Sequence, residues 1–144
     1  MKPAVILFSD AGLDTAKRAA AAIDAEIYSC GQGGADGLKL LPKLFAGGRP
    51  IVGICAAGIL IRLLAPSLAD KRKEPPVLAI SQDGASVVPL LGGHHGANRM
   101  ARQLAEALGG APAITTASDS RFAHGLDEPP EGWVLGTPQD ASPL

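Results

Sequence analysis

The sequence predicts an open α/β domain of three layers, with a mainly parallel, Rossmann-like sheet and helices on both of its faces. Two observations lead to this fold class. Short apolar runs alternate with Ala- and Leu-rich segments of helical spacing, which is the order of successive βα units. The 144 residues are 47% hydrophobic but only 3% aromatic and include 18 Gly and 12 Pro, which suits tight βα turns better than an aromatic-rich β-sandwich.

The first half of the chain contains three predicted strand–helix units. Each predicted strand is a short apolar run, as expected for strands that are covered on both faces. The predicted strands are 3–9, 25–30 and 50–55. The predicted helices are 13–23, 38–45 and 56–68. We expect the third helix to be broken near Pro66 and Asp70, because proline cannot continue a helix.

The second half begins with a charged loop at 70–76 and then a predicted hairpin. Val77–Ser81 and Ser86–Leu91 are apolar β segments, and Asp83-Gly84 between them is a strong turn signal. A helix at 98–108 and a last strand at 113–116 complete a sheet of about five strands. The folded domain is therefore expected to span residues 1–119. Residues 120–144 are rich in Pro, Gly and acids and are expected to form a tail or linker.

Charge, hydropathy and cysteine content exclude several classes of protein. The formal net charge is −1, and no Lys/Arg run alternates with aromatic residues, so nucleic acid is not an expected partner. The apolar start at 1–8 is too short for a membrane span or signal-peptide core, so we expect a cytoplasmic protein without a membrane anchor. Cys30 and Cys55 form no CxxC pair, which predicts two reduced thiols and no metal site.

Three loops are candidates for a ligand site. In open parallel sheets, ligands gather at the carboxyl ends of the strands, where helix starts offer N–H donors. The loops at 55–58, 92–98 and 115–119 each follow a predicted strand, so we expect them to converge at that edge. Gly31–Gly34 lacks the GxGxxG register and no GxxxxGK[ST] motif exists, which argues against a nucleotide cofactor.

Within these loops, His94 and His95 are the candidate catalytic residues. A free imidazole in a ligand crevice acts as a general acid or base near neutral pH. The alternative is that one histidine caps the following helix while the other is solvated. Metal binding by the pair is not expected, because neighbouring residues rarely reach one ion and no further ligands complete the shell.

Several other loop residues are candidates for contacts with the substrate. Arg62 lies in an apolar stretch, so it either extends to solvent or binds an anion such as a substrate carboxylate. Asn98 is either a helix N-cap or a ligand contact. The basic run at 71–73 is either a solvated segment or the rim of a site for a polycarboxylate. The predicted substrate-binding residues are Ala57, Gly58, Arg62, Gly92, Gly93, Asn98, Thr115 and Thr116.

Four motifs follow one another over about half the chain: Gly53–Ile59 with Arg62 and Ala65-Pro66, Asp70–Val77, Leu90–His94, and Ile114–Asp119. In this order they resemble the N-terminal domain of the CbiG family of cobalamin biosynthesis. The resemblance implies an α/β fold and a corrin precursor as small-molecule ligand, with cobalt only as part of that substrate. CbiG proteins are cobalt-precorrin-5A hydrolases, which open a ring A lactone and release a two-carbon fragment as acetaldehyde.

The chain also departs from this family pattern in ways that leave two functions open. The family usually shows Gly-His-x-Gly-Gly-Ala-Asn, whereas Gly93–Asn98 is one residue shorter. Residues 119–133 are similar to the join between a CbiG-like domain and a precorrin-3B C17-methyltransferase of the CobJ type, which implies a fused or partner methyltransferase. The first hypothesis is a hydrolase of the corrin-precursor lactone. The second is a non-catalytic tetrapyrrole-binding accessory domain of that methyltransferase.

Overall fold

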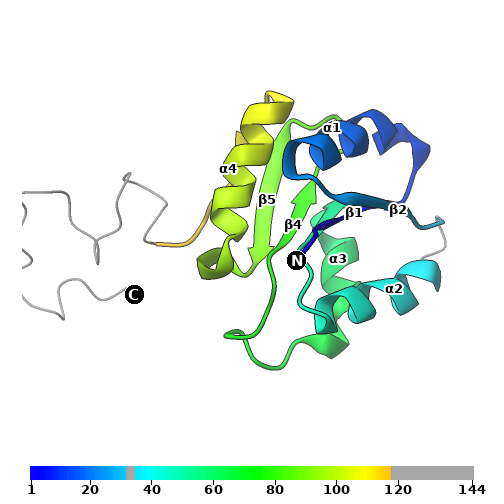
Figure 1. The fold of residues 1–144 in the computed structure, drawn as a ribbon, viewed down its shortest axis with the longest axis vertical. Helices are drawn as coiled ribbons and strands as arrows, with labels where there is room; N and C mark the ends of the chain where they lie inside the picture. Colours follow the sequence, from blue (N-terminus) through cyan, green and yellow to red (C-terminus); the bar gives the residue numbers. More distant parts are fainter. Residues whose placement is uncertain (32–34, 118–144) are drawn as a thin grey trace, which may run out of the picture. The chain divides into compact units, whose positions relative to one another are not determined.

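The computed structural model describes residues 1–31 and 35–117, and it shows a mixed six-stranded sheet with four helices packed on it (Figure 1). The strands are β1 (Ala4–Leu7), β2 (Glu26–Ser29), β3 (Ile51–Ile54), β4 (Val77–Ile80), β5 (Ser86–Leu91) and β6 (Ala111–Pro112). The helices are α1 (Leu13–Ile23), α2 (Ala35–Ala46), α3 (Ala57–Leu64) and α4 (Ala97–Leu108).

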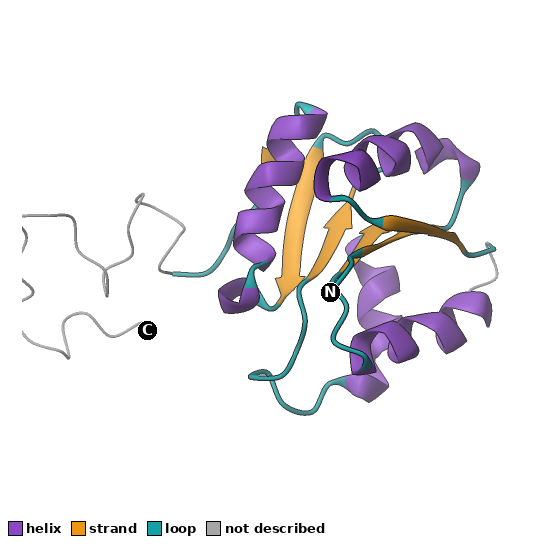
Figure 2. Cartoon of the chain, in the orientation of Figure 1, coloured by secondary structure: helices purple, strands orange, loops and turns teal. Residues whose placement is uncertain are grey.

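The strand order β2-β1-β3-β4-β5-β6 combines a parallel half with a hairpin. Strands β2, β1, β3 and β4 run parallel to one another, whereas β5 is antiparallel to β4. Every residue of β1, β3 and β4 is buried, as expected for apolar strands covered on both faces. Helices α1 and α4 build a core on one face, and α2 and α3 build a core on the other (Figure 2). The predicted three-layer α/β fold is confirmed.

The predicted hairpin at Asp83-Gly84 is also confirmed, and side-chain hydrogen bonds hold its turn. Ser81 Oγ donates to Asp83 Oδ1 at 2.7 Å, and the backbone N–H of Ala85 donates to the same oxygen at 3.0 Å. Thr15 Oγ1 of α1 donates to the carbonyl oxygen of Gln82 at 2.6 Å, which ties the turn to the helix layer. The turn replaces the crossover helix of a βα unit, so β5 returns along β4 in the opposite direction.

The end of the sheet differs from the sequence-based expectation. The predicted last strand at 113–116 is wrong, because β6 is Ala111–Pro112. Gly109 and Gly110 reverse the chain so tightly that the backbone N–H of Ala111 already donates to Ala85 O, at 2.9 Å. Helix α3 also ends earlier than expected, at Leu64, and a short 3₁₀ turn containing Pro66 follows it.

The described contacts divide the chain into two compact units, Met1–Ala113 and Ile114–Leu144. The whole sheet and all four helices belong to the first unit. Residues 114–117 of the second unit are described. The predicted tail at 120–144 lies outside the described residues, and its boundary at residue 119 stays a prediction.

Candidate functional site

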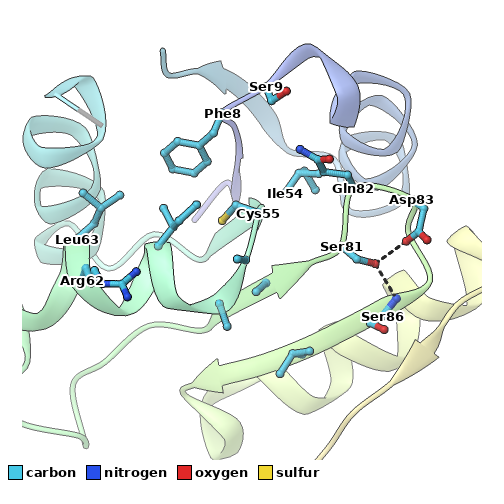
Figure 3. A pocket seen from close by; sticks show the side chains of 15 residues that line it. Phe8, Ser9, Ile54, Cys55, Arg62, Leu63, Ser81, Gln82, Asp83 and Ser86 are labelled. Carbon is cyan, nitrogen blue, oxygen red and sulfur yellow. Dashed lines mark hydrogen bonds between the residues drawn. The ribbon is translucent and has the colours of Figure 1, made fainter. Parts of the chain in front are cut away.

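The carboxyl ends of β1, β3 and β4 meet at one edge of the sheet, which we call the carboxyl edge, and enclose a cleft of about 1070 Å³ (Figure 3). After β1 the chain goes to β2 on one side, and it then crosses to β3 on the other side of β1. This reversal of strand order is the position where open α/β sheets bind ligands. The cleft is lined by Phe8, Ser9, Ile54, Cys55, Ala56, Ala57, Ile59, Arg62, Leu63, Ala79, Ser81, Gln82, Asp83, Ser86 and Val88.

The floor of the cleft is apolar and includes one thiol. Cys55 and Leu63 belong to the core on the α2–α3 face of the sheet, Phe8 packs against that core, and all three line the cleft. Burial raises the pKa of the Cys55 thiol to about 12, so the thiol stays protonated at neutral pH. Since the thiolate is the nucleophilic form of cysteine, Cys55 contributes apolar surface to the cleft rather than a nucleophile. Cys30 is buried too, and the prediction that the two cysteines form no disulfide is confirmed.

One side of the cleft is polar and comes from the hairpin turn. Ser81, Gln82 and Asp83 line it, and Ser9 follows β1 at the same edge. Hydrogen bonds from the Ala85 backbone N–H and from the Ser81 hydroxyl lower the pKa of the Asp83 carboxyl. Asp83 is therefore a carboxylate at neutral pH and a weak base.

The opposite side of the cleft is formed by the start of α3, where N–H groups and a guanidinium could bind an anion. The N-cap residue Ala56 makes no side-chain cap, and the first N–H groups of a helix have no partner within the helix. Arg62 extends from the next turn of α3 and is the only Lys or Arg among the described cleft residues (Figure 3). Its Nη1 lies 3.3 Å from the point that a Cβ on Gly58 would occupy, so Gly58 leaves the space for the guanidinium. Ala57, Gly58 and Arg62 are thus brought together, as the sequence predicts.

The turn at Gly92–His95 lies at the other end of the sheet, so the expected convergence of the three loops is wrong. Leu91 at the end of β5 pairs with Val77 at the start of β4, because the two strands are antiparallel. Gly92, Gly93, His94 and His95 therefore follow at the edge where β4 begins, which we call the amino edge. The Asp83-Gly84 turn predicts the hairpin, and the reversed direction of β5 then carries this loop to the opposite end of the sheet.

The amino-edge turn packs closely against the proline backbone and presents both histidines to solvent. Gly92 adopts a left-handed conformation with φ of 73°, and a Cβ there would meet the backbone of Pro75 and Pro76 at 2.9 Å. His95 Nδ1 lies 2.9 Å from the carbonyl oxygen of Glu74. Since a carbonyl only accepts, Nδ1 carries the proton, and in the neutral ring Nε2 is left as the acceptor. His94 and His95 are both exposed.

The sequence offers Asn98, or one of the two histidines, as the residue that caps the start of α4. The N-cap of α4 is Gly96, and no side chain caps the helix. The capping hypotheses for Asn98 and for a histidine are therefore wrong. Asn98 is buried in the first turn of α4, with 3% of its surface exposed.

The basic run at 71–73 does not line the cleft. Lys71–Lys73 is exposed in the loop that leads to the start of β4, and Arg72 pairs with Asp70 at 3.2 Å, as expected for a solvated run. Thr115 and Thr116 belong to the second compact unit, where Thr115 is exposed and Thr116 is half-buried. Their role as substrate contacts stays a prediction.

Two kinds of feature are absent from residues 1–31 and 35–117, which the structure describes. No group of three or more His, Cys, Asp or Glu side chains there is placed to hold a metal ion. No helix in this part of the chain is long and apolar enough to cross a membrane.

Sequence reasoning missed the cleft residues that belong to β5 or follow β1 and β4. Phe8 and Ser9 follow β1, and Ser81–Asp83 follows β4. The signal was present, because every parallel strand of one sheet ends at the same edge, so the residues after each such strand are neighbours. Val88 on β5 had no such signal, since its place depends on the register of the hairpin.

Comparison with known proteins agrees with the motifs. Cobalt-precorrin-5A hydrolase of Priestia megaterium is 37% identical over 108 residues, covering 73% of this chain and 29% of that protein. The protein of the same name from Salmonella typhimurium is 45% identical over 78 residues, covering 54% of this chain and 22% of that one. The chain thus spans less than a third of the length of these curated relatives.

A solved structure and a family description complete the comparison. A cobalamin biosynthesis protein G homologue from Sulfolobus solfataricus shares the fold, with a TM-score of 0.64 at 24% identity over 79% of this chain and 36% of that one. None of these matches supports a fused methyltransferase. The family described as cobalamin synthesis G, N-terminal matches residues 39–119, more than half of the chain. The chain therefore belongs to the CbiG N-terminal family.

Proposed function

We propose that this domain binds a corrin precursor of cobalamin biosynthesis in the carboxyl-edge cleft. The relatives named cobalt-precorrin-5A hydrolase support this class of ligand. The observation that carries the proposal is the cleft itself, with an apolar floor at the reversal of strand order and Arg62 as the one cation among its described lining residues. A corrin precursor joins a largely apolar macrocycle to peripheral carboxylates. The guanidinium of Arg62 and the first amides of α3 suit one of those carboxylates.

The chemistry of the cleft favours binding over hydrolysis. Lactone opening needs a base or nucleophile with a pKa near the working pH. Cys55 stays protonated, and the lowered pKa of Asp83 makes it a weak base. The two histidines lie at the amino edge, away from the cleft. In this account the domain holds and orients the precursor and does not itself open the lactone.

A hydrolase is the second candidate, and the orientation of His95 favours it. Its ring is fixed through Nδ1 by the Glu74 carbonyl, and this leaves Nε2 to accept a proton from water. The substrate would then bind at the amino edge beside Lys71–Lys73. A steady-state assay of lactone opening with the chain and with His95→Ala separates the two candidates. The binding account predicts that the substitution leaves any turnover unchanged.

The longer relatives raise the question of partners. A fused or partner methyltransferase, which residues 119–133 suggest, stays a prediction and is checked by the length of the parent reading frame. The alternative of a non-catalytic accessory domain is compatible with the cleft, because a binding domain needs no base of its own.

The proposal is tested by titrating a corrin polycarboxylate, such as cobyrinic acid, into the chain by calorimetry. Arg62→Ala should weaken binding by about 10- to 100-fold, the loss of one charge-assisted hydrogen bond, and should reduce the salt dependence. Lys71→Ala is the matched control, since it removes an exposed cation at the amino edge, and it should leave the affinity unchanged. A larger loss with Lys71→Ala than with Arg62→Ala would overturn the proposal.

A further inference from the structure

The hairpin leaves part of the sheet without a helix cover. In a βα crossover, the helix between two parallel strands packs on one face of the sheet. Strands β4 and β5 are joined by a tight turn instead, so this helix does not exist. Among the described elements, α4 packs against β5 from the face that it shares with α1, and α3 reaches β4 on the other face. The α3 side of β5 is left open beside the cleft.

Apolar side chains on this open face line the cleft. Val87 belongs to the core under α1 and α4, so its neighbour Val88 points to the other face. Val88 pairs with Ala79 of β4 across the hairpin, and both line the cleft, as does Ile59 of α3. Val88 is half-buried and Ile59 is 36% exposed. Together these three residues form an apolar wall that we call the β4–β5 platform.

Apolar side chains also line a second groove farther along β5. Leu90 lines a second, smaller groove of about 100 Å³ at the far end of α3, together with Ile61 and Leu68. Ile61 is 54% exposed and Leu68 is 40% exposed. Exposed apolar side chains are therefore also present beside α3 outside the cleft.

We propose that the β4–β5 platform is where the flat macrocycle of the ligand lies, with Val88 as the residue that sets how closely the ring approaches. This inference rests on the proposed function and adds to it the position of the ring. The position of Arg62 supports it, because the guanidinium lines the same cleft from the α3 side while Val88 lines it from β5. A ring seated on the platform puts a peripheral carboxylate within the reach of Arg62. Apolar burial then contributes affinity and the ion pair fixes the orientation.

Val88→Trp tests the platform, because it places a large side chain where the ring is proposed to lie. Ile27→Trp is the matched control, since Ile27 is also a β-branched residue on a strand, is 40% exposed and does not line the cleft. With cobyrinic acid as the probe, we expect Val88→Trp to weaken binding at least tenfold and Ile27→Trp to leave it unchanged. Circular dichroism and thermal unfolding check that both variants fold. If Val88→Trp does not fold, Val88→Ala is used, with an expected loss of about 2- to 5-fold for the removed apolar contact.

The same titrations distinguish failure of the platform from failure of the proposed function. Wild-type affinity in the folded Val88 variant, together with weakened binding by Arg62→Ala, overturns the platform and leaves the proposed function standing. Wild-type affinity in both the Val88 and the Arg62 variants overturns both. Equal weakening by Val88→Trp and Ile27→Trp also overturns the platform, since the effect would then not depend on the cleft.

Discussion

The two edges of the sheet each have a glycine at a position of close approach, and the approaching groups differ. At the carboxyl edge, the neighbour of Gly58 is the guanidinium end of Arg62, a flexible side chain that lines the cleft. At the amino edge, the neighbour of Gly92 is the backbone of Pro75 and Pro76. Glycine in a loop thus signals close approach, but the topology decides whether the space serves a ligand-binding side chain or the packing of the chain on itself.

The largest expected effect concerns the reactivity of the Cys55 thiol at the carboxyl edge. Because burial raises the pKa of Cys55 from 9.0 to about 12, its thiolate fraction near pH 8 should be about a thousandfold lower than that of an ordinary thiol. Alkylation of Cys55 in a Cys30→Ala background should therefore be slower by a similar factor in the native protein than in denaturant. Fast native alkylation would contradict the assignment of Cys55 to the cleft floor.

The same shift predicts how stability depends on pH. The folded state holds the thiol proton more tightly than the unfolded state does, so this contribution is complete below about pH 9 and is lost as the pH rises toward 12. The free energy of unfolding should fall by up to about 1.4 kcal/mol per pH unit in that window. Comparison with Cys55→Ala by urea unfolding isolates the contribution of this thiol.

The next largest effect is the difference in stability between Gly92→Ala and Gly58→Ala. Gly92→Ala should destabilise the fold by about 2–4 kcal/mol, since alanine resists the left-handed conformation and its Cβ meets the proline backbone. Gly58→Ala should change stability by less than about 1 kcal/mol, because a helical alanine is favourable and only the end of Arg62 has to move. Urea unfolding of both variants measures the difference. Equal destabilisation by the two substitutions would contradict the difference between the neighbours of Gly92 and of Gly58.

For ligand affinity we expect the reverse, with a larger effect of Gly58→Ala than of Gly92→Ala. Gly58→Ala pushes the guanidinium of Arg62 away from the first turn of α3, so the affinity for the corrin polycarboxylate should fall by about 2- to 10-fold. Gly92→Ala, measured at a temperature where it is folded, should bind as the wild type does. Weaker binding by Gly92→Ala would place the ligand at the amino edge.

The smallest effect separates the two nitrogens of His95. His95→Asn keeps a donor near the position of Nδ1, whereas His95→Gln moves the amide to the position of Nε2 and loses the bond to Glu74. His95→Gln should therefore cost about 1 kcal/mol of stability and His95→Asn less. The same pair of substitutions at His94 serves as the control and should show no difference. If Asn and Gln were equivalent at His95, the carbonyl would not be what orients the ring.

Much of the fold could be predicted from the sequence because its signals are local. The continuous apolar runs of β1, β3 and β4 and the Asp83-Gly84 turn each depend on a few adjacent residues. The position of β6 could not be predicted, because it is set by hydrogen bonds between Ala111 and Ala85 and between Ala113 and Val87.

The candidate site was predictable only where local reasoning was enough. Gly58 and Arg62 are one helical turn apart on α3, so their proximity follows from the sequence. The position of His94 depends on the direction in which β5 runs, which is a property of the whole sheet. The pKa of Cys55 and the open face at Val88 depend on which helices cover which strands, and no short motif records that.

The central claim is that the ligand binds at the carboxyl edge and not at the amino edge. It is tested most directly by a ¹⁵N-edited NMR titration of the chain with cobyrinic acid, following the backbone amides of both edges. The account predicts saturable shifts at Ser9, Ala57, Gly58 and Ser81–Asp83, with Gly93–His95 unchanged. Shifts confined to Gly93–His95 and the neighbouring start of α4, with the cleft amides unchanged, would contradict it.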